Sequence, residues 1–162
     1  MKKFLAFMLS VCILALDQLT KYWALKALSP YEPVSVVPFL NWTLSYNTGA
    51  AFSFLGSTGA WHLWFFMIFS ALMSCYIAVW MVRKTHEHAL ELYGLSCVLG
   101  GALGNLVDRL LHGYVVDFIA VYYKTYHFAV FNVADSAITL GGFFLILSWS
   151  IKPKKAPIVL DR

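Results

Sequence analysis

Four of the eight acidic residues in this 162-residue chain lie in or beside long apolar runs: Asp17, Asp108, Asp117 and Asp135. A carboxylate at membrane depth is costly, and such residues usually have a function. Asp117 and Asp135 have no nearby Lys or Arg in the sequence that could neutralise them in a simple ion pair. We therefore treat these two aspartates as candidates for chemistry.

Two neighbouring carboxylates in a site of low dielectric constant do not both ionise easily, so one keeps a proton while the other stays charged. The ionised carboxylate can take a proton from a water that attacks a peptide carbonyl, and the protonated one can hydrogen-bond the developing oxyanion. This is the chemistry of an aspartic protease. The histidines do not form a zinc set, because His86 and His88 share one connection and the other three are scattered. We expect no metal and no cofactor.

Other polar residues lie close to these carboxylates in the sequence. Asn132 and Asp135 are one helical turn apart at the start of the last apolar stretch. Asn105, Asp108 and Arg109 recur at i, i+3 and i+4 and so share one helical face. Asp108 and Arg109 could contact each other or pair across helices. Alternatively, Asn105 and Arg109 donate hydrogen bonds into a polar pocket that Asp108 steadies.

Further segments carry candidate support residues. Asp17 and Lys21 are four residues apart near the outward end of the first apolar stretch, where a structural ion pair is the simplest interpretation. Asn47-Thr48-Gly49 is a turn signal before an apolar run, which would aim the Asn47 amide back at the membrane, although asparagine is common in turns. Gly100 and Gly104 form a G-x-x-x-G arrangement, which favours close packing of another helix.

The elements that must position these side chains are membrane helices. Hydrophobic residues make up 60% of the chain and charged residues 12%, against roughly 25% charged in soluble domains. Four stretches approach the roughly 20 apolar residues that a spanning helix needs, at about 4–24, 60–82, 89–111 and 131–151. We expect one mainly α integral-membrane domain over 1–162. Residues 1–16 also resemble a removable signal peptide, but no A-x-A site follows them, so we expect a mature first helix.

The basic residues predict the orientation of these spans. Lys2 and Lys3, then Arg83 and Lys84, and then the basic tail at 152–162 fall on one side of an even number of spans. The positive-inside rule makes that side cytoplasmic, so the connections at about 28–58 and 112–130 face outward. The net charge of +4 therefore reflects topology. We expect no nucleic-acid partner, because the basic residues are not clustered on a predicted soluble face.

The outward segment at about 29–59 has a different composition. Pro30, Pro33 and Pro38 punctuate short β-favouring runs at 34–37 and 42–46. This pattern predicts a small strand-rich extracytoplasmic element between the first two helices, and an irregular surface loop is the alternative. Its aromatic residues, which include Tyr31 and Trp42, suit the membrane interface.

Five motifs together, in order along nearly the whole chain, resemble those of bacterial lipoprotein signal peptidases, the type II signal peptidases. These motifs are Asp17-Gln18-Leu19-Thr20-Lys21, Asn47-Thr48-Gly49-Ala50-Ala51-Phe52, Gly104-Asn105-Leu106-Val107-Asp108-Arg109, Gly113 to Phe118, and Phe131 to Asp135. The resemblance implies four spans and an aspartic endopeptidase of the bacterial inner membrane. Such an enzyme removes the signal peptide from prolipoproteins, just before a cysteine that carries a diacylglyceryl group.

The resemblance also implies roles for single residues. Asp117 and Asp135 match the catalytic pair, and the supporting or substrate-binding positions fall on Asp17, Lys21, Asn47, Gly49, Asn105, Asp108, Arg109 and Asn132. The outward segment would cradle the substrate near the periplasmic face, and a hydrophobic path between helices would accept its lipid. Membrane lipids and the cyclic peptide inhibitor globomycin are further implied partners.

Two other classes of protein stay open on the residues alone. A small proton-coupled transporter would also hold carboxylates in the membrane, but such folds often contain internal repeats with sites near the midplane. Here the two halves differ in loop length, and the acids cluster toward one face. A structural assembly subunit would explain the G-x-x-x-G arrangement but would leave Asp117 and Asp135 without partners.

Overall fold

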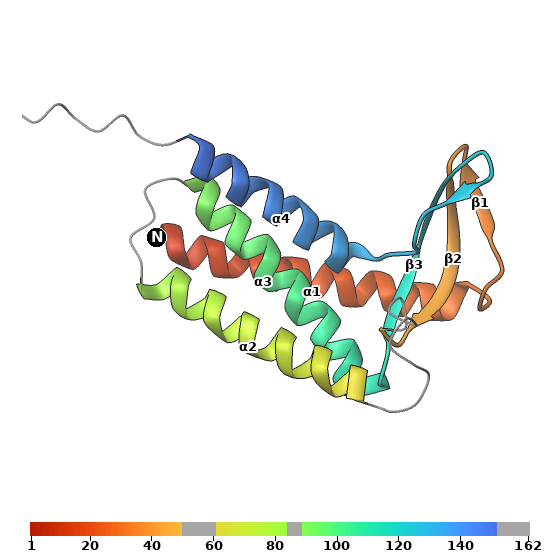
Figure 1. The fold of residues 1–162 in the computed structure, drawn as a ribbon, viewed down its shortest axis with the longest axis horizontal. Coiled ribbons are helices and arrows are strands. Elements are labelled where there is room, and N and C mark those ends of the chain that lie inside the picture. The colour runs from red at the N-terminus through yellow and green to blue at the C-terminus, as the bar shows by residue number, and fades with distance from the viewer. Residues whose placement is uncertain (50–60, 84–88, 152–162) are drawn as a thin grey trace, which may run out of the picture.

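Four apolar helices and a small antiparallel sheet make up the fold in this computed structural model, which describes residues 1–49, 61–83 and 89–151 (Figure 1). Each helix is long and apolar enough to cross a membrane. The helices are α1 (Lys2–Ala27), α2 (Trp61–Arg83), α3 (Ala89–His112) and α4 (Val133–Ser150). The end of the expected strand-rich segment, Ala50 to Phe52 of its motif, Lys84, His86 and His88, and the basic tail at 152–162 lie outside the described residues.

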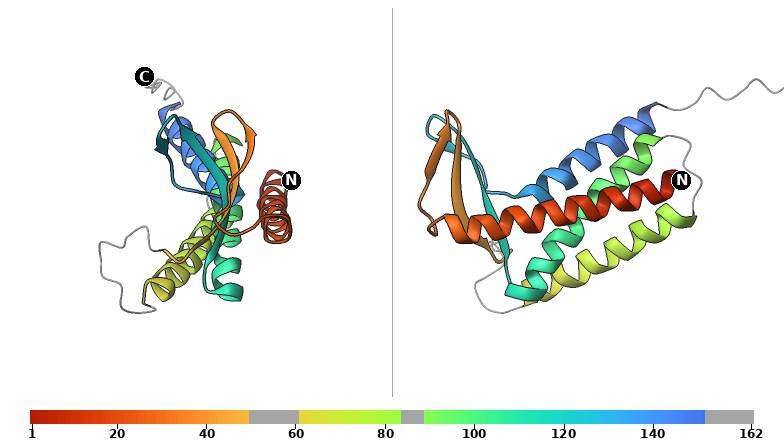
Figure 2. Two further views of the ribbon diagram at one scale, coloured as in Figure 1. Left: turned by 90° about the vertical axis from the view of Figure 1, so that its right-hand side faces the viewer. Right: turned by 180° about the vertical axis from the view of Figure 1, so that it is seen from behind.

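The third helix is the centre of the bundle, because α1, α2 and α4 each pack against α3 (Figure 2). The glycines of α3 allow this close approach. A Cβ atom on Gly100 would lie 2.7 Å from the backbone oxygen of Ser10, and one on Gly104 would lie 2.5 Å from Oδ2 of Asp17. The G-x-x-x-G arrangement therefore serves helix packing, as expected.

The sheet has the order β1-β2-β3-β4 and is antiparallel throughout. Its strands are β1 (Val34–Val37), β2 (Leu40–Asn47), β3 (Val115–Tyr123) and β4 (Tyr126–His127). The predicted class, four membrane helices with a strand-rich element after the first, is confirmed, and the irregular-loop alternative is wrong. Half of the strands, however, come from the connection between α3 and α4, which the sequence analysis did not assign to a sheet.

The sheet packs on the C-terminal end of α1. Leu44, Val116 and Phe118 form a buried apolar cluster with Ala24 of α1. Trp23 adds an edge-on ring contact with Phe118, at 6.2 Å between ring centroids. This cluster fixes β3, and therefore Asp117, against the helices.

The start of α4 depends on the sheet. Phe131 exchanges backbone hydrogen bonds of 2.8 and 3.0 Å with Ile119 of β3, so its backbone is extended rather than helical. The helix consequently begins at Val133, two residues after the start of the apolar stretch at 131. Asn132 is the N-cap, and it forms a capping box with Asp135.

Candidate active site

Asp117 lies on β3, opposite Ser45 of β2, and its side chain is buried. The side-chain amide of Asn132 donates a hydrogen bond of 2.7 Å to its Oδ1. The amide of Asn47 donates one of 3.0 Å to its Oδ2. Each oxygen of this carboxylate therefore has one neutral donor and no directly bonded cation among the described residues.

Asp135 lies in the first turn of α4. Its Oδ1 accepts a hydrogen bond of 2.8 Å from the amide of Asn105, and its Oδ2 accepts one of 3.2 Å from the backbone N–H of Asn132. The backbone N–H of Asp135 donates in return to Oδ1 of Asn132, at 2.9 Å. Asn132 thus bonds both carboxylates, and so it links the two candidate catalytic residues.

Burial raises the pKa of Asp117 to about 7, and the negative charge of Asp135 adds to this rise. The hydrogen bonds from Asn47 and Asn132 act in the opposite direction. The pKa of Asp117 therefore lies well above its ordinary value of 3.8. Near neutral pH Asp117 can therefore hold a proton, which it could donate as an acid.

A buried network of ion pairs lies next to Asp117 and Asp135. The ammonium of Lys21 contacts Oδ2 of Asp17 at 2.8 Å and Oδ2 of Asp108 at 3.0 Å. It also donates a hydrogen bond of 3.0 Å to Oδ1 of Asn105. The predicted ion pair between Asp17 and Lys21 is present, and it extends to Asp108. Asp108 therefore steadies the cluster through Lys21, not through Arg109.

The two carboxylates of this network also bind backbone. Oδ1 of Asp17 accepts from the N–H of Ala134 at 2.9 Å, and Oδ2 of Asp108 accepts from the N–H of Val116 at 2.9 Å. Ala134 precedes Asp135, and Val116 precedes Asp117. The network therefore holds the two segments that carry the catalytic candidates at a fixed place beside α1 and α3.

The turn after β2 orients the Asn47 amide. The backbone N–H of Gly49 donates to Oδ1 of Asn47 at 2.9 Å, which leaves Nδ2 to point at Asp117. Gly49 has φ +85°, a conformation that favours glycine. A Cβ there would also lie 2.9 Å from the ring of Phe66.

Arg109 also lies at this end of α3. Its guanidinium donates to the backbone oxygen of Asn105 at 3.3 Å and sits over the ring of Phe66, at 5.3 Å from the centroid. Neither contact is a carboxylate. Its remaining N–H groups can donate to other acceptors.

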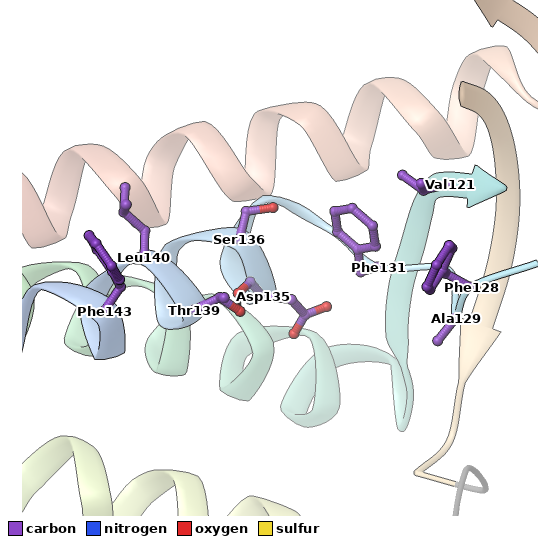
Figure 3. A pocket seen from close by; sticks show the side chains of 9 residues that line it. All are labelled: Val121, Phe128, Ala129, Phe131, Asp135, Ser136, Thr139, Leu140 and Phe143. Carbon is purple, nitrogen blue, oxygen red and sulfur yellow. Dashed lines mark hydrogen bonds between the residues drawn. The ribbon is translucent and has the colours of Figure 1, made fainter. Parts of the chain in front are cut away.

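An apolar pocket of about 900 Å³ opens beside Asp135 (Figure 3). Its lining comes from α4, from β3 and from the segment between β4 and α4. The lining residues are Val121, Phe128, Ala129, Phe131, Asp135, Ser136, Thr139, Leu140 and Phe143. An elongated apolar group in this pocket would lie next to a carboxylate of the pair.

A sequence profile of the family described as signal peptidase (SPase) II matches residues 9–151 of the chain. The chain belongs to this family. A lipoprotein signal peptidase from Coxiella burnetii (strain RSA 493 / Nine Mile phase I) is 49% identical over 148 residues, which cover 91% of each protein. One from Acinetobacter baumannii (strain ATCC 17978) is 48% identical over 149 residues, 92% of this chain and 85% of that protein.

The fold agrees with this assignment. A solved structure of a bacterial membrane enzyme has a TM-score of 0.81 to this chain at 30% identity, and the match covers 91% of this chain and 94% of that one. This signal peptidase is therefore a hydrolase, and it spans a bacterial membrane with several helices. The resemblance inferred from the five motifs is confirmed. Membership of a peptidase family favours the enzyme over the transporter and over the assembly subunit.

Every predicted site residue of this signal peptidase lies at one end of the bundle. All but Arg109 belong to one connected set of hydrogen bonds and ion pairs. Arg109 contacts this set through the backbone oxygen of Asn105. The sequence analysis missed Gln18. Its amide donates to Oδ1 of Asp108 at 2.9 Å, to Oδ2 of Asp17 at 3.2 Å and to the backbone oxygen of Gly104 at 3.1 Å. A polar amide between Asp17 and Lys21, at the end of a long apolar run, was the available signal.

Proposed function

We propose that this signal peptidase is an aspartic endopeptidase that removes signal peptides from diacylglyceryl-modified prolipoproteins, just before the lipidated cysteine. The observation that carries the proposal is the sharing of Asn132 between Asp117 and Asp135. Two carboxylates joined in this way, on separate elements and mostly shielded from water, suit an acid and base that act on one peptide bond. The relatives named lipoprotein signal peptidase support the substrate class.

In the proposed mechanism, a water between the carboxylates loses a proton to the ionised member and attacks the scissile carbonyl. The protonated member donates a hydrogen bond to the developing oxyanion, and the leaving amine then takes up a proton. Asn47 and Asn132 hold Asp117, and Asn105 holds Asp135, so neither carboxylate has to be ordered when substrate binds. Arg109 would bind a carbonyl oxygen of the substrate backbone.

The pocket beside Asp135 is the proposed site for apolar substrate groups. Its lining is almost wholly apolar, so it can take up a lipid chain that the membrane delivers. Globomycin would inhibit by occupying the same end of the bundle. Ala129→Trp would add bulk to this pocket without changing a polar partner of the pair, and it should raise KM for the lipidated substrate.

The proposed orientation places the sheet and the carboxylates near the periplasmic face of the inner membrane, with both termini cytoplasmic. Lys2, Lys3 and Arg83 support it, because they lie at the end of the bundle away from the sheet (Figure 1). A substrate that is anchored in the outer leaflet by its lipid would then meet the site at its own depth.

The test is cleavage of a diacylglyceryl-modified prolipoprotein in detergent, followed by gel shift. Folded Asp117→Asn and Asp135→Asn variants should each lose cleavage. Glu32→Gln is the matched control, because it makes the same chemical change at an exposed carboxylate before β1. Cleavage that survives at the native rate in either aspartate variant would overturn the catalytic assignment.

A further inference from the structure

A second apolar groove lies between α1 and α2, far from the carboxylate pair. Both helices pack on α3 but make little contact with each other (Figure 2). One depression of about 290 Å³ lies between the middle parts of α1, α2 and α3, and another of about 250 Å³ lies toward the N-terminal end of α1. Phe7 and Ala78 line both depressions, so the two adjoin each other, and we refer to them together as the groove.

The groove has the length of one membrane leaflet. Along α2 its lining runs from Ser74 to Arg83, nine residue steps apart, which corresponds to about 14 Å at 1.5 Å per residue. Half of a bilayer hydrocarbon core is about 15 Å thick. A groove of this length, which starts at the last residue of α2, matches the length of one acyl chain in one leaflet.

Two cations lie at the surface end of the groove. Arg83 is part of its lining, and the ammonium of Lys3 donates a hydrogen bond of 2.6 Å to the backbone oxygen of Val82. Within residues 1–49, 61–83 and 89–151, no carboxylate lies within ion-pair distance of either cation. Lys3 still has N–H donors to offer, and the guanidinium of Arg83 can bind phosphate oxygens in pairs.

We propose that this groove binds one anionic phospholipid, with an acyl chain against Phe7 and Ala78 and the phosphate between Lys3 and Arg83. Basic pockets between membrane helices recognise anionic lipid headgroups in this way. A zwitterionic headgroup fits less well, because its own cation would face Lys3 and Arg83. The site lies at the opposite end of the bundle from Asp117 and Asp135, so its occupant is not the peptidase substrate.

The test is native mass spectrometry of the full chain in detergent with phosphatidylglycerol or phosphatidylcholine of identical chains. We expect one retained phosphatidylglycerol, bound about tenfold or more tightly than phosphatidylcholine, from the contribution of two basic groups. Lys3→Gln with Arg83→Gln should abolish this preference. Lys26→Gln, at the other end of α1, is the control and should keep it.

Filling the groove is the second arm of the test. Val11→Trp introduces bulk at a lining residue, and Leu16→Trp does so outside the lining, at a side chain of the same helix that is equally exposed, 54% in both cases. Only Val11→Trp should reduce phosphatidylglycerol retention. Equal retention of the two lipids by the native chain, or equal loss in the two tryptophan variants, would overturn the proposal. Unfolding temperatures would show that each variant is folded.

Discussion

The buried ammonium of Lys21 donates a hydrogen bond of 3.0 Å to the side-chain oxygen of Asn105. An ammonium only donates, so it holds that oxygen toward itself and turns the amide N–H₂ of Asn105 toward Asp135. A cation on α1 thereby orients the hydrogen-bond donor of a catalytic candidate on α4.

Replacing this cation should therefore affect both stability and cleavage. Lys21→Met leaves Asp17 and Asp108 buried without their common partner, and removing one member of a buried ion pair costs about 3–5 kcal/mol. We expect a lower free energy of unfolding and loss of prolipoprotein cleavage. Thermal unfolding and the gel-shift assay measure the two effects. Lys26→Met, an exposed change on the same helix, should leave both unchanged.

Asn132→Ala should reduce cleavage more than it reduces stability. The variant loses the helix N-cap, which is worth about 1 kcal/mol, and it also loses the amide that donates to Asp117. We expect cleavage to fall by about a hundredfold or more, since positioned acid–base groups contribute factors of that order. Ser150→Ala, at the far end of α4, should cleave at the native rate. A native rate in Asn132→Ala as well would show that the shared amide has no part in catalysis.

The pH dependence of cleavage should report the raised pKa of Asp117. If the pair acts with one proton, cleavage falls as pH rises through about 7, because the shared proton is then lost. A rate measured with lipidated substrate from pH 5 to pH 9 tests this expectation. A rate that stays constant from pH 6 to pH 9 would contradict the one-proton scheme.

Stability should depend on the same ionisation. The folded pKa lies above the ordinary value of 3.8, so between pH 4 and pH 7 the folded chain binds a proton that the unfolded chain has released. The free energy of unfolding therefore falls as pH rises through this window, because the proton that the folded chain must bind becomes scarcer. Above the window it changes little. Asp117→Asn should remove this slope in unfolding temperatures measured from pH 4 to pH 8.

Two glycines offer a matched pair of packing tests. Gly104→Ala would place a Cβ 2.5 Å from Oδ2 of Asp17, so it should disturb the ion network and lower both stability and cleavage. A Cβ on Gly142 of α4 would have no neighbouring atom within 4 Å. Gly142→Ala should be neutral, or stabilising by about 0.5–1 kcal/mol from helix propensity. Equal unfolding temperatures for the two variants would argue against a tight network at Gly104.

The sequence alone was sufficient to predict features that depend on a single segment of the chain. Apolar length predicted the four spans, and the spacing of Asn132 and Asp135 placed both on the first turn of one helix. These predictions depend on periodicity and length, which are properties of a single segment.

Contacts between segments were harder to predict. Residues 115–123 lack an alternating pattern because the start of β3 is buried on both faces, so the strand was not recognised. The helical start at Val133 depends on the backbone pairing of Phe131 with Ile119. Asp108 pairs with Lys21 from another helix, a partner that neither its neighbours nor its helical face could identify.

The capping box of α4 has a consequence for how the enzyme meets its substrate. Asp135 must bond the backbone of Asn132 to close the helix start, and the same conformation points its other oxygen to the amide of Asn105. Folding of the helix thereby preorganises the carboxylate. None of the binding free energy of the prolipoprotein is then needed to order this group, and it remains for alignment of the scissile bond.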